Sequence, residues 1–155
     1  MQTLRPLVTG TDFSDCAEEA LEVALGLAGA AGTGLTLVHV CELSVDETDE
    51  QQLYRCREML ATVVAKHRGR GVEITAVLRS GRPWEKLDNL AVEVGASLIV
   101  IGRYGAGGVG LELGTVADHL VRSASRPVLT VSCHLTRFDD EADENTNQRA
   151  KENQS

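Results

Sequence analysis

Residues 96–121 decide the fold and read ASLIVIGRYGAGGVGLELGTVADHLV. An apolar run at 96–101 is followed by six glycines between Gly102 and Thr115, and then by a helix-like segment that begins at Thr115. Because glycine has no Cβ atom, its backbone N–H groups can approach an anion closely, and the dipole of the following helix adds partial positive charge. We therefore expect a strand, a phosphate-binding loop and a helix in this stretch.

Strands and helices alternate along the rest of the chain. The apolar runs that we predict as strands are residues 4–10, 35–41, 72–78, 97–101 and 127–132. The segments that we predict as helices, from apolar residues spaced three and four apart and from Ser, Asp, Gly and Pro at their ends, are 15–30, 51–67, 83–94 and 115–123. This alternation predicts an α/β fold, a single-domain open doubly wound five-stranded parallel sheet with helices on both faces.

The predicted fold also indicates where a ligand would bind. In open parallel sheets, ligands lie beyond the carboxyl ends of the strands, near the point where the strand order reverses. Gly10, Thr11 and Asp12 stand at the carboxyl end of the first predicted strand, and the glycine-rich segment stands at the carboxyl end of the fourth. We expect these two turns to converge on one site.

Composition and charge exclude several classes of protein. The chain has 155 residues, 43% of them hydrophobic, and a formal net charge of −8, whereas a nucleic-acid-binding protein needs a basic surface. No apolar run approaches the roughly 18 residues of a membrane-spanning helix, and the first residues lack a signal-peptide pattern, so we expect a cytoplasmic protein with no membrane partner. Residues 1–135 are expected to form the domain, and the acidic segment 136–155 a disordered tail.

The cysteines and histidines give no clear metal motif. Cys16, Cys41, Cys56 and Cys133 are scattered and include no C-x-x-C pair, so we expect reduced thiols that pack as small apolar groups. His39 lies inside the second predicted strand, where we expect it to make a satisfied hydrogen bond in the core. No set of these residues has the spacing of a zinc motif.

Two common phosphate-binding motifs fail to explain the glycine-rich segment. A P-loop requires a Gly-Lys pair, and the chain has none. A G-x-G-x-x-G match does occur at Gly105–Gly110, but in dinucleotide-binding folds this motif follows the first strand and is followed, about 20 residues later, by an acidic residue. Here the motif follows the fourth predicted strand, and no carboxylate stands at 128–130.

Five short motifs and one glycine instead suggest a known family. They are VTGTDFS at 8–14, LVHV at 37–40, GASLIVIG at 95–102, GTVA at 114–117 and RPVLTV at 126–131, with Gly81 ahead of the third helix. In this order they resemble a universal stress protein domain over most of the chain. The resemblance implies a stress-response regulatory or sensor module, and a homodimer that pairs through the fifth strand at the edge of the sheet.

The ATP-binding branch of that family carries G-x-x-G, nine residues, then G-[ST]; here Gly102 to Gly105 and Gly114-Thr115 supply both ends, with eight residues between them. The resemblance implies that ATP or another adenine nucleotide binds here, with Mg²⁺ or Mn²⁺ held mainly by its phosphates. The implied contacts are Gly10 and Val40 with the base, Asp12 with adenine and ribose, Gly102 and Gly105 with ribose and α-phosphate, and Gly114, Thr115 and Val116 with the β- and γ-phosphates.

Several residues have a second interpretation. Ser14 or Asp15 can cap the helix that runs to residue 30, but Asp12 could instead be a helix cap for residues 14–28. Arg103 is either a phosphate ligand or a solvated loop residue. We expect Trp84 to pack on the domain and His119 to lie at the surface. No catalytic residue is predicted, because no base stands out that could position a water molecule. The alternatives are a family member that binds no nucleotide and acts through protein–protein contacts, and a slow ATPase.

Overall fold

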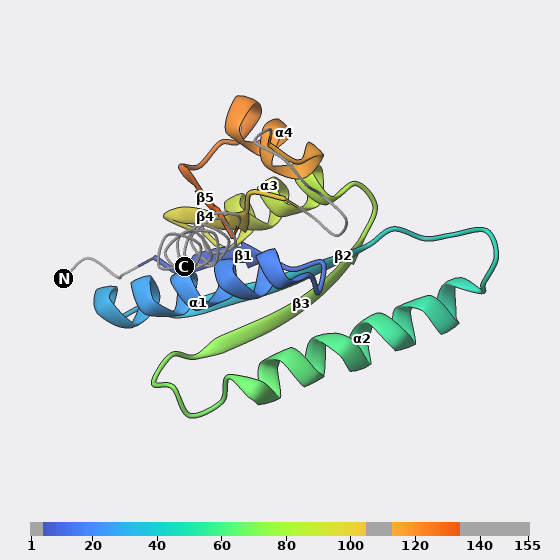
Figure 1. Ribbon diagram of the computed structural model, residues 1–155, viewed down its shortest axis with the longest axis horizontal. Helices are drawn as coiled ribbons and strands as arrows, with labels where there is room; N and C mark the ends of the chain where they lie inside the picture. The colour runs from blue at the N-terminus through green and yellow to red at the C-terminus, as the bar shows by residue number, and fades with distance from the viewer. Residues whose placement is uncertain (1–4, 105–112, 134–155) are drawn as a thin grey trace, which may run out of the picture.

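A computed structural model describes residues 5–104 and 113–133 of the chain. The strands are β1 (Leu7–Gly10), β2 (Leu35–Cys41), β3 (Ile74–Ser80), β4 (Leu98–Gly102) and β5 (Val128–Val131). They form one five-stranded sheet in the order β3-β2-β1-β4-β5, and every neighbouring pair is parallel (Figure 1). This confirms the predicted α/β fold. The predictions for Gly105 and for the tail at 136–155 fall outside the described residues.

The helices lie on both faces of the sheet. They are α1 (Asp15–Ala31), α2 (Asp49–Lys66), α3 (Pro83–Glu93) and α4 (Thr115–Ser123). Figure 1 shows α1 and α2 on one side of the sheet and α3 and α4 on the other. Within the described ranges, no helix combines the length and the apolarity that crossing a bilayer requires.

Side chains at the helix starts set the helix bounds. The Ser14 side chain accepts a hydrogen bond from the backbone N–H of Ala17, which caps α1 as predicted. Thr48 caps α2 in the same way, accepting from the N–H of Gln51, and α2 therefore begins at Asp49 rather than at Gln51. The third strand was predicted at 72–78, but β3 spans Ile74–Ser80. Its bounds are fixed by pairing with β2, which runs from Leu35↔Ile74 to Cys41↔Ser80.

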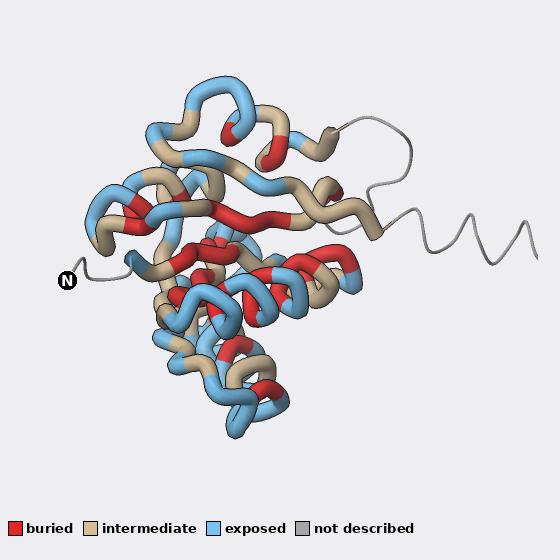
Figure 2. The backbone as a smooth tube through the Cα atoms, turned by 90° about the vertical axis from the view of Figure 1, so that its left-hand side faces the viewer, coloured by how far each residue is buried: buried red, intermediate tan, exposed pale blue. Residues whose placement is uncertain are grey.

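The core has two layers, one on each face of the sheet. Figure 2 shows the buried positions gathered along the central strands and on the inner sides of the helices. The buried residues between the sheet and α1 and α2 include Leu7, Leu21, Leu25, Leu35, Leu37, Leu60 and Val100. Those between the sheet and α3 and α4 include Val8, Val38, Leu87, Leu90, Ile99, Ile101 and Leu120. Because side chains alternate along a strand, each strand supplies both layers.

A polar cluster joins the end of α2 to α1. The carboxylate Oε1 of Glu18 lies 2.8 Å from Nζ of Lys66 and 2.8 Å from Nε2 of His67, which is buried. Burial alone would raise the pKa of Glu18, but the hydrogen bonds from Lys66 and His67 outweigh it and hold the pKa below its ordinary value. Glu18 is therefore ionised and paired at neutral pH.

The prediction that all the cysteines are reduced is wrong for one pair. Cys16, in the first turn of α1, and Cys133, just after β5, form a disulfide with a Cα–Cα distance of 5.3 Å. The two residues are 117 positions apart, and only the fold brings the start of α1 beside the end of β5. Cys41 and Cys56 are free thiols, as predicted.

Candidate functional site

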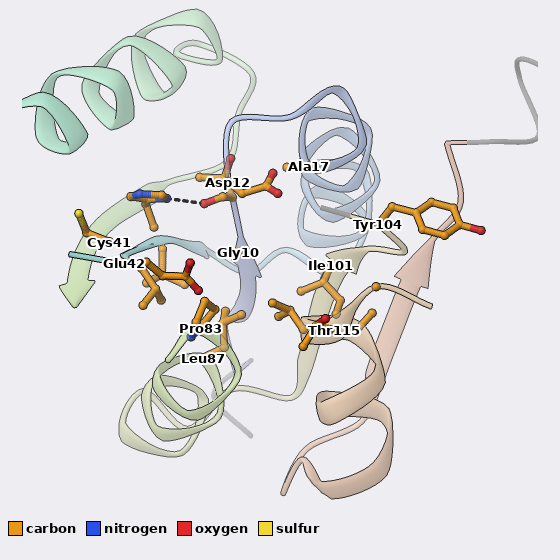
Figure 3. Close-up of a pocket in the computed structure, with 18 of the residues that line it drawn as sticks. Gly10, Asp12, Ala17, Cys41, Glu42, Pro83, Leu87, Ile101, Tyr104 and Thr115 are labelled. Carbon is orange, nitrogen blue, oxygen red and sulfur yellow. Dashed lines mark hydrogen bonds between the residues drawn. The ribbon is translucent and has the colours of Figure 1, made fainter. Parts of the chain in front are cut away.

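The strand order reverses between β1 and β4, which lie side by side in the sheet. From β1 the chain continues to β2 and β3 on one side, whereas β4 and β5 lie on the other. At the carboxyl ends of these strands a cleft of about 740 Å³ opens (Figure 3). Small-molecule sites commonly have volumes of about 300–1,000 Å³, so a ligand of nucleotide size would fit.

The residues that the sequence singled out come together in this cleft. The predicted site residues within the described ranges that line it are Gly10, Asp12, Val40, Gly102, Gly114, Thr115 and Val116. They come from β1, β2, β4, the start of α4 and the turns that follow β1 and precede α4. The convergence expected from the strand order is therefore present.

Two glycines of the cleft have close neighbours where a Cβ atom would stand. A Cβ atom on Gly10 would lie 3.1 Å from both terminal carbons of Leu87, a flexible side chain. A Cβ atom on Gly102 would lie 3.1 Å from the carbonyl carbon and oxygen of Cys16, which are backbone atoms and cannot rotate away. Gly102 thus allows β4 to pass directly against the first turn of α1.

The turn after β1 carries Asp12. Its Oδ1 atom accepts hydrogen bonds from the backbone N–H of Ser14, at 3.0 Å, and from the Ser14 hydroxyl. Because Ser14 is itself the cap of α1, Asp12 holds the capping residue rather than the helix. Asp12 is therefore not itself the cap of α1. Its carboxylate is exposed and lines the cleft, a position compatible with contact to a ligand.

The start of α4 faces the same cleft without a side-chain cap. Gly114 is its N-cap residue, and no side-chain cap bond is formed there within the described part of the chain. By contrast, Ser14 and Thr48 cap α1 and α2. The first N–H groups of a helix have no partner inside it and carry the positive end of its dipole. Thr115 and the two residues after it line the cleft, so this helix start is open to an anionic ligand.

Both ends of the glycine-rich segment are fixed to the sheet. The backbone N–H of Gly114 donates to the carbonyl of Arg103 at 2.9 Å, and the N–H of Arg103 donates to the carbonyl of Val131 at 2.8 Å. Arg103 also lines the cleft, and its guanidinium carbon lies 5.5 Å from the ring centre of the buried Tyr104. The backbone of Arg103 is therefore joined to the start of α4, and Arg103 contributes to the wall of the cleft.

The opposite wall, formed by β2 and α2, carries side chains that the sequence did not assign to the site. Cys41, Glu42, Gln52, Arg55 and Cys56 all line the cleft. Burial, and next the hydrogen bond from Cys56, raise the pKa of the Cys41 thiol to about 11, so this group is protonated at neutral pH. One signal was available in the sequence, because Cys41 ends a predicted strand whose carboxyl end faces the site.

The remaining aromatic and histidine predictions concern His39, Trp84 and His119. The Nδ1 atom of His39 lies 2.7 Å from the carbonyl oxygen of Thr11, which confirms the expected hydrogen bond, although the side chain is half-buried and lines the cleft. Trp84 stacks on the exposed His119 with ring centres 4.0 Å apart, as expected of residues that pack on the domain surface.

Comparison with known proteins agrees with this architecture. The model of the universal stress protein family matches residues 3–132. The chain belongs to the universal stress protein family. A universal stress protein of Thermus aquaticus is 33% identical to it over 134 residues, which cover 82% of this chain and 98% of the relative.

Solved structures of the family superpose on the same region. A universal stress protein in complex with cAMP is 25% identical, with a TM-score of 0.69 over 84% of this chain and 98% of the other. The universal stress protein of Archaeoglobus fulgidus in complex with dAMP is 27% identical, with a TM-score of 0.66 over 84% of this chain and 98% of the other. Both of these relatives were therefore solved with an adenine nucleotide.

Proposed function

We propose that this universal stress protein binds an adenine nucleotide in the cleft between β1, β4 and α4, and acts as a regulatory or sensor module. The observation that carries the proposal is the convergence of the uncapped start of α4 with Asp12 across the point where the strand order reverses. Relatives of 25% and 27% identity solved with cAMP and dAMP support the same ligand class.

Different residues of the cleft suit the phosphates, the ribose and the base of a nucleotide. Phosphate oxygens match the N–H groups of Thr115 and Val116, the Thr115 hydroxyl and the cation of Arg103. Asp12 can accept a hydroxyl of the ribose, and Val40 offers an apolar surface beside Gly10 for the base. These are the groups that would distinguish a nucleotide from inorganic phosphate.

ATP with Mg²⁺ or Mn²⁺ is the specific ligand that we propose. The chain already carries a net charge of −8, and a triphosphate adds about four negative charges, so a divalent cation on the phosphate oxygens lowers the electrostatic cost. The bond between Gly114 and the Arg103 carbonyl holds the two ends of the eight-residue segment together, which supports binding despite its reduced length.

We also propose a cytoplasmic homodimer that pairs through β5. Among the described residues β5 pairs with β4 alone, and Leu129 on it is 37% exposed. An apolar edge strand of this kind is usually covered in the native assembly. Sedimentation of the purified protein tests this point, because a monomer at every concentration would contradict it.

The ligand itself is tested by two measurements on the full chain. Small molecules released by denaturing freshly purified protein are identified by mass spectrometry, and thermal melting is followed with Mg-ATP, AMP and cAMP. We expect a bound adenine nucleotide and a rise in melting temperature, since a ligand that binds only the folded state stabilises it. If neither signal is seen, the chain acts without a nucleotide, through protein contacts.

Matched variants test the site. Asp12→Asn and Thr115→Ala each remove one hydrogen-bonding partner, and each is expected to weaken binding by about 5- to 20-fold, the equivalent of about 1–2 kcal/mol. Asp15→Asn in the first turn of α1 and Thr62→Ala on α2 change the same residue types at exposed positions outside the cleft. Nucleotide binding that Asp12→Asn and Thr115→Ala leave unchanged would place the ligand elsewhere.

A further inference from the structure

Three side chains on the β2 and α2 wall of the cleft form a compact group of metal-ligand atoms. His39 and Cys41 come from β2, and Cys56 comes from α2. Their ligand atoms all lie within 4.8 Å of one another, and the two sulfur atoms are 3.1 Å apart. Figure 3 shows Cys41 at the edge of the cleft, on the opposite side from Thr115.

The hydrogen bond of His39 fixes which of its ring nitrogens can bind a metal. Its Nδ1 atom lies 2.7 Å from the Thr11 carbonyl oxygen, which can only accept, so Nδ1 carries the proton and Nε2 presents a lone pair. The ring also packs against Phe13, with ring centres 4.4 Å apart. A hydrogen bond from the second ring nitrogen to a backbone carbonyl is the usual way in which proteins fix a metal-binding histidine.

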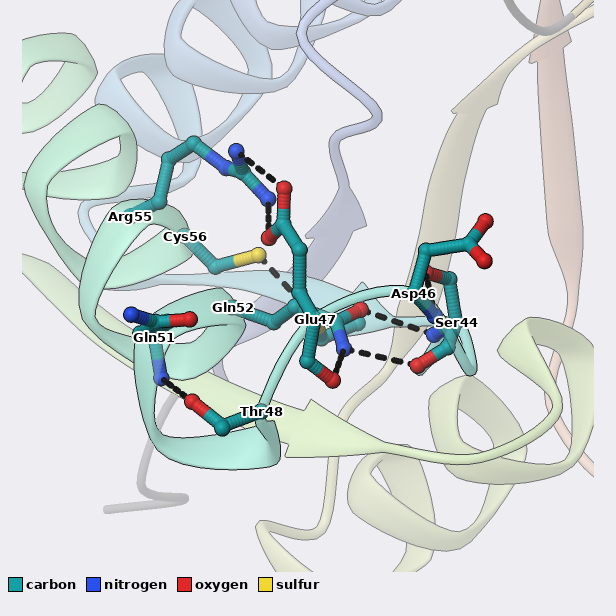
Figure 4. A network of polar contacts seen from close by, with 9 residues as sticks. Ser44, Asp46, Glu47, Thr48, Gln51, Gln52, Arg55 and Cys56 are labelled. Atoms are coloured by element: carbon teal, nitrogen blue, oxygen red, sulfur yellow. Dashed lines mark hydrogen bonds and ion pairs between the residues drawn. The ribbon is translucent and has the colours of Figure 1, made fainter.

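The helix that carries Cys56 is held firmly at its start. Figure 4 shows the polar contacts there: the Gln52 side chain donates to the carbonyls of Ser44 and Glu47 at 2.9 and 3.2 Å and accepts from the Ser44 N–H. Arg55 on α2 also forms an ion pair with Glu47, which precedes the helix. These contacts fix α2 against the loop after β2, so the two sulfur atoms are brought together by the fold.

We propose that His39, Cys41 and Cys56 bind one Zn²⁺ ion, with the fourth coordination position open to the cleft. Zinc binding would release the protons of both thiols to solvent, since thiolates are the ligands. Two thiolates and one imidazole suit zinc, and a site with three protein ligands leaves one place for water or a substrate atom. Mg²⁺ and Ca²⁺ are excluded as occupants because they select oxygen ligands. The proposal goes beyond nucleotide binding and does not depend on it.

The observed spacing requires only a small adjustment. With Zn–S bonds of about 2.3 Å and tetrahedral angles, two ligand sulfurs stand about 3.8 Å apart, whereas a disulfide needs about 2.05 Å. The observed 3.1 Å is closer to the zinc value. The alternative product of this pair, a Cys41–Cys56 disulfide, is the competing outcome of the test.

A second group of candidate ligands is less suitable. Glu18, Glu22 and His67 also bring their ligand atoms within 4.8 Å of one another. Their carboxylates, however, are paired with Lys66 and Arg70 at 2.8 Å, so a cation would have to displace existing positive charges. The cation near Cys41 and Cys56 is Arg55, which is held in an ion pair with Glu47 rather than with the sulfur atoms.

The test is metal binding by the full chain, reduced and free of nucleotide. Zn²⁺ is titrated in competition with a chromophoric chelator, and Co²⁺ is used as a spectroscopic probe for thiolate ligands. We expect one equivalent of zinc and a sulfur-to-cobalt charge-transfer band. Cys56→Ser and His39→Gln should each weaken zinc binding by at least about 100-fold, since even the loss of an outer-shell partner typically costs 10- to 100-fold.

Two controls separate this site from other thiols and histidines. His119→Gln changes an exposed histidine outside the cleft, and Cys16→Ala/Cys133→Ala removes the other pair of sulfur atoms. Both proteins should bind zinc as the unaltered chain does. If a ligand variant fails to fold, as judged by its thermal melting, the cobalt spectrum of the Cys16→Ala/Cys133→Ala chain decides, because Cys41 and Cys56 are the cysteines left in it.

Three results would overturn the proposal. The reduced chain could take up no zinc in competition with the chelator, or its cobalt complex could lack the charge-transfer band. Zinc binding could also survive in both Cys56→Ser and His39→Gln. A Cys41–Cys56 disulfide that forms readily in air, in a chain that binds no zinc when reduced, would identify the pair as a redox couple instead.

Discussion

The Cys16–Cys133 disulfide should account for a large part of the stability of the domain. It joins the first turn of α1 to the end of the edge strand β5 and closes a loop of 117 residues. We consider its removal by Cys16→Ala/Cys133→Ala, which leaves no thiol at either position. Cys16 lies against Gly102, which lines the cleft.

The size of the effect follows from the length of the loop. In the chain-entropy description, a loop of this length destabilises the unfolded chain by about 5 kcal/mol. With a urea m-value of about 2 kcal/mol/M, this loss lowers the midpoint of unfolding by about 2.5 M. Any structure that remains in the unfolded chain reduces the effect, so the value is an upper limit.

The assay is urea unfolding of the oxidised chain, the reduced chain and the double variant. We expect the reduced chain and the variant to unfold at similar urea concentrations, both well below the oxidised chain. Reductant added to the variant should change nothing, because the cysteines left in it, Cys41 and Cys56, are free thiols. An oxidised chain with four free thiols, or with the same midpoint before and after reduction, would refute the reasoning.

Two other predictions concern the packing of α1. Because the folded pKa of Glu18 is lowered, its contribution to stability is present above the ordinary glutamate value of about 4.3 and is lost as the pH falls through the folded pKa. Glu18→Gln should therefore flatten the acid side of a plot of unfolding free energy against pH, whereas Glu58→Gln on the exposed side of α2 should not. Gly102→Ala forces a Cβ atom to 3.1 Å from the Cys16 backbone and should cost about 1–3 kcal/mol in urea unfolding. Gly26→Ala, inside α1 with open space around the new Cβ, should stabilise by up to about 1 kcal/mol, and equal effects of the two changes would contradict the close approach.

The periodic elements of the fold were predictable because each is fixed by local signals. Ser14 before an apolar helical stripe and Pro83 at the start of α3 are capping and first-turn residues, and both helices begin where these residues predict. The bounds of β3 were predicted less well, since they are set by pairing with β2 and not by the apolar residues of β3 alone. Strand pairing is a non-local property that the sequence of one strand does not contain.

The same distinction separates the two sides of the site. Gly10, Asp12, Gly102, Gly114 and Thr115 follow strands or begin a helix, and parallel strands bring such positions to one edge of the sheet, so their convergence was predictable. The cysteine pairs were not. Cys16 meets Cys133 across 117 positions, and Cys56 meets Cys41 because the start of α2 is fixed against the loop after β2.

The two walls of the cleft favour ligands of opposite character. The start of α4 offers N–H donors to a hard anion, whose Mg²⁺ takes oxygen ligands, whereas Cys41 and Cys56 offer sulfur to a softer ion. A nucleotide with its Mg²⁺ and a zinc ion would therefore not compete for the same protein atoms. They would interact only if an atom of the nucleotide occupied the open position on zinc. Linkage requires that the two affinities change by the same factor, so a zinc affinity that the nucleotide leaves unchanged would exclude a shared ligand atom.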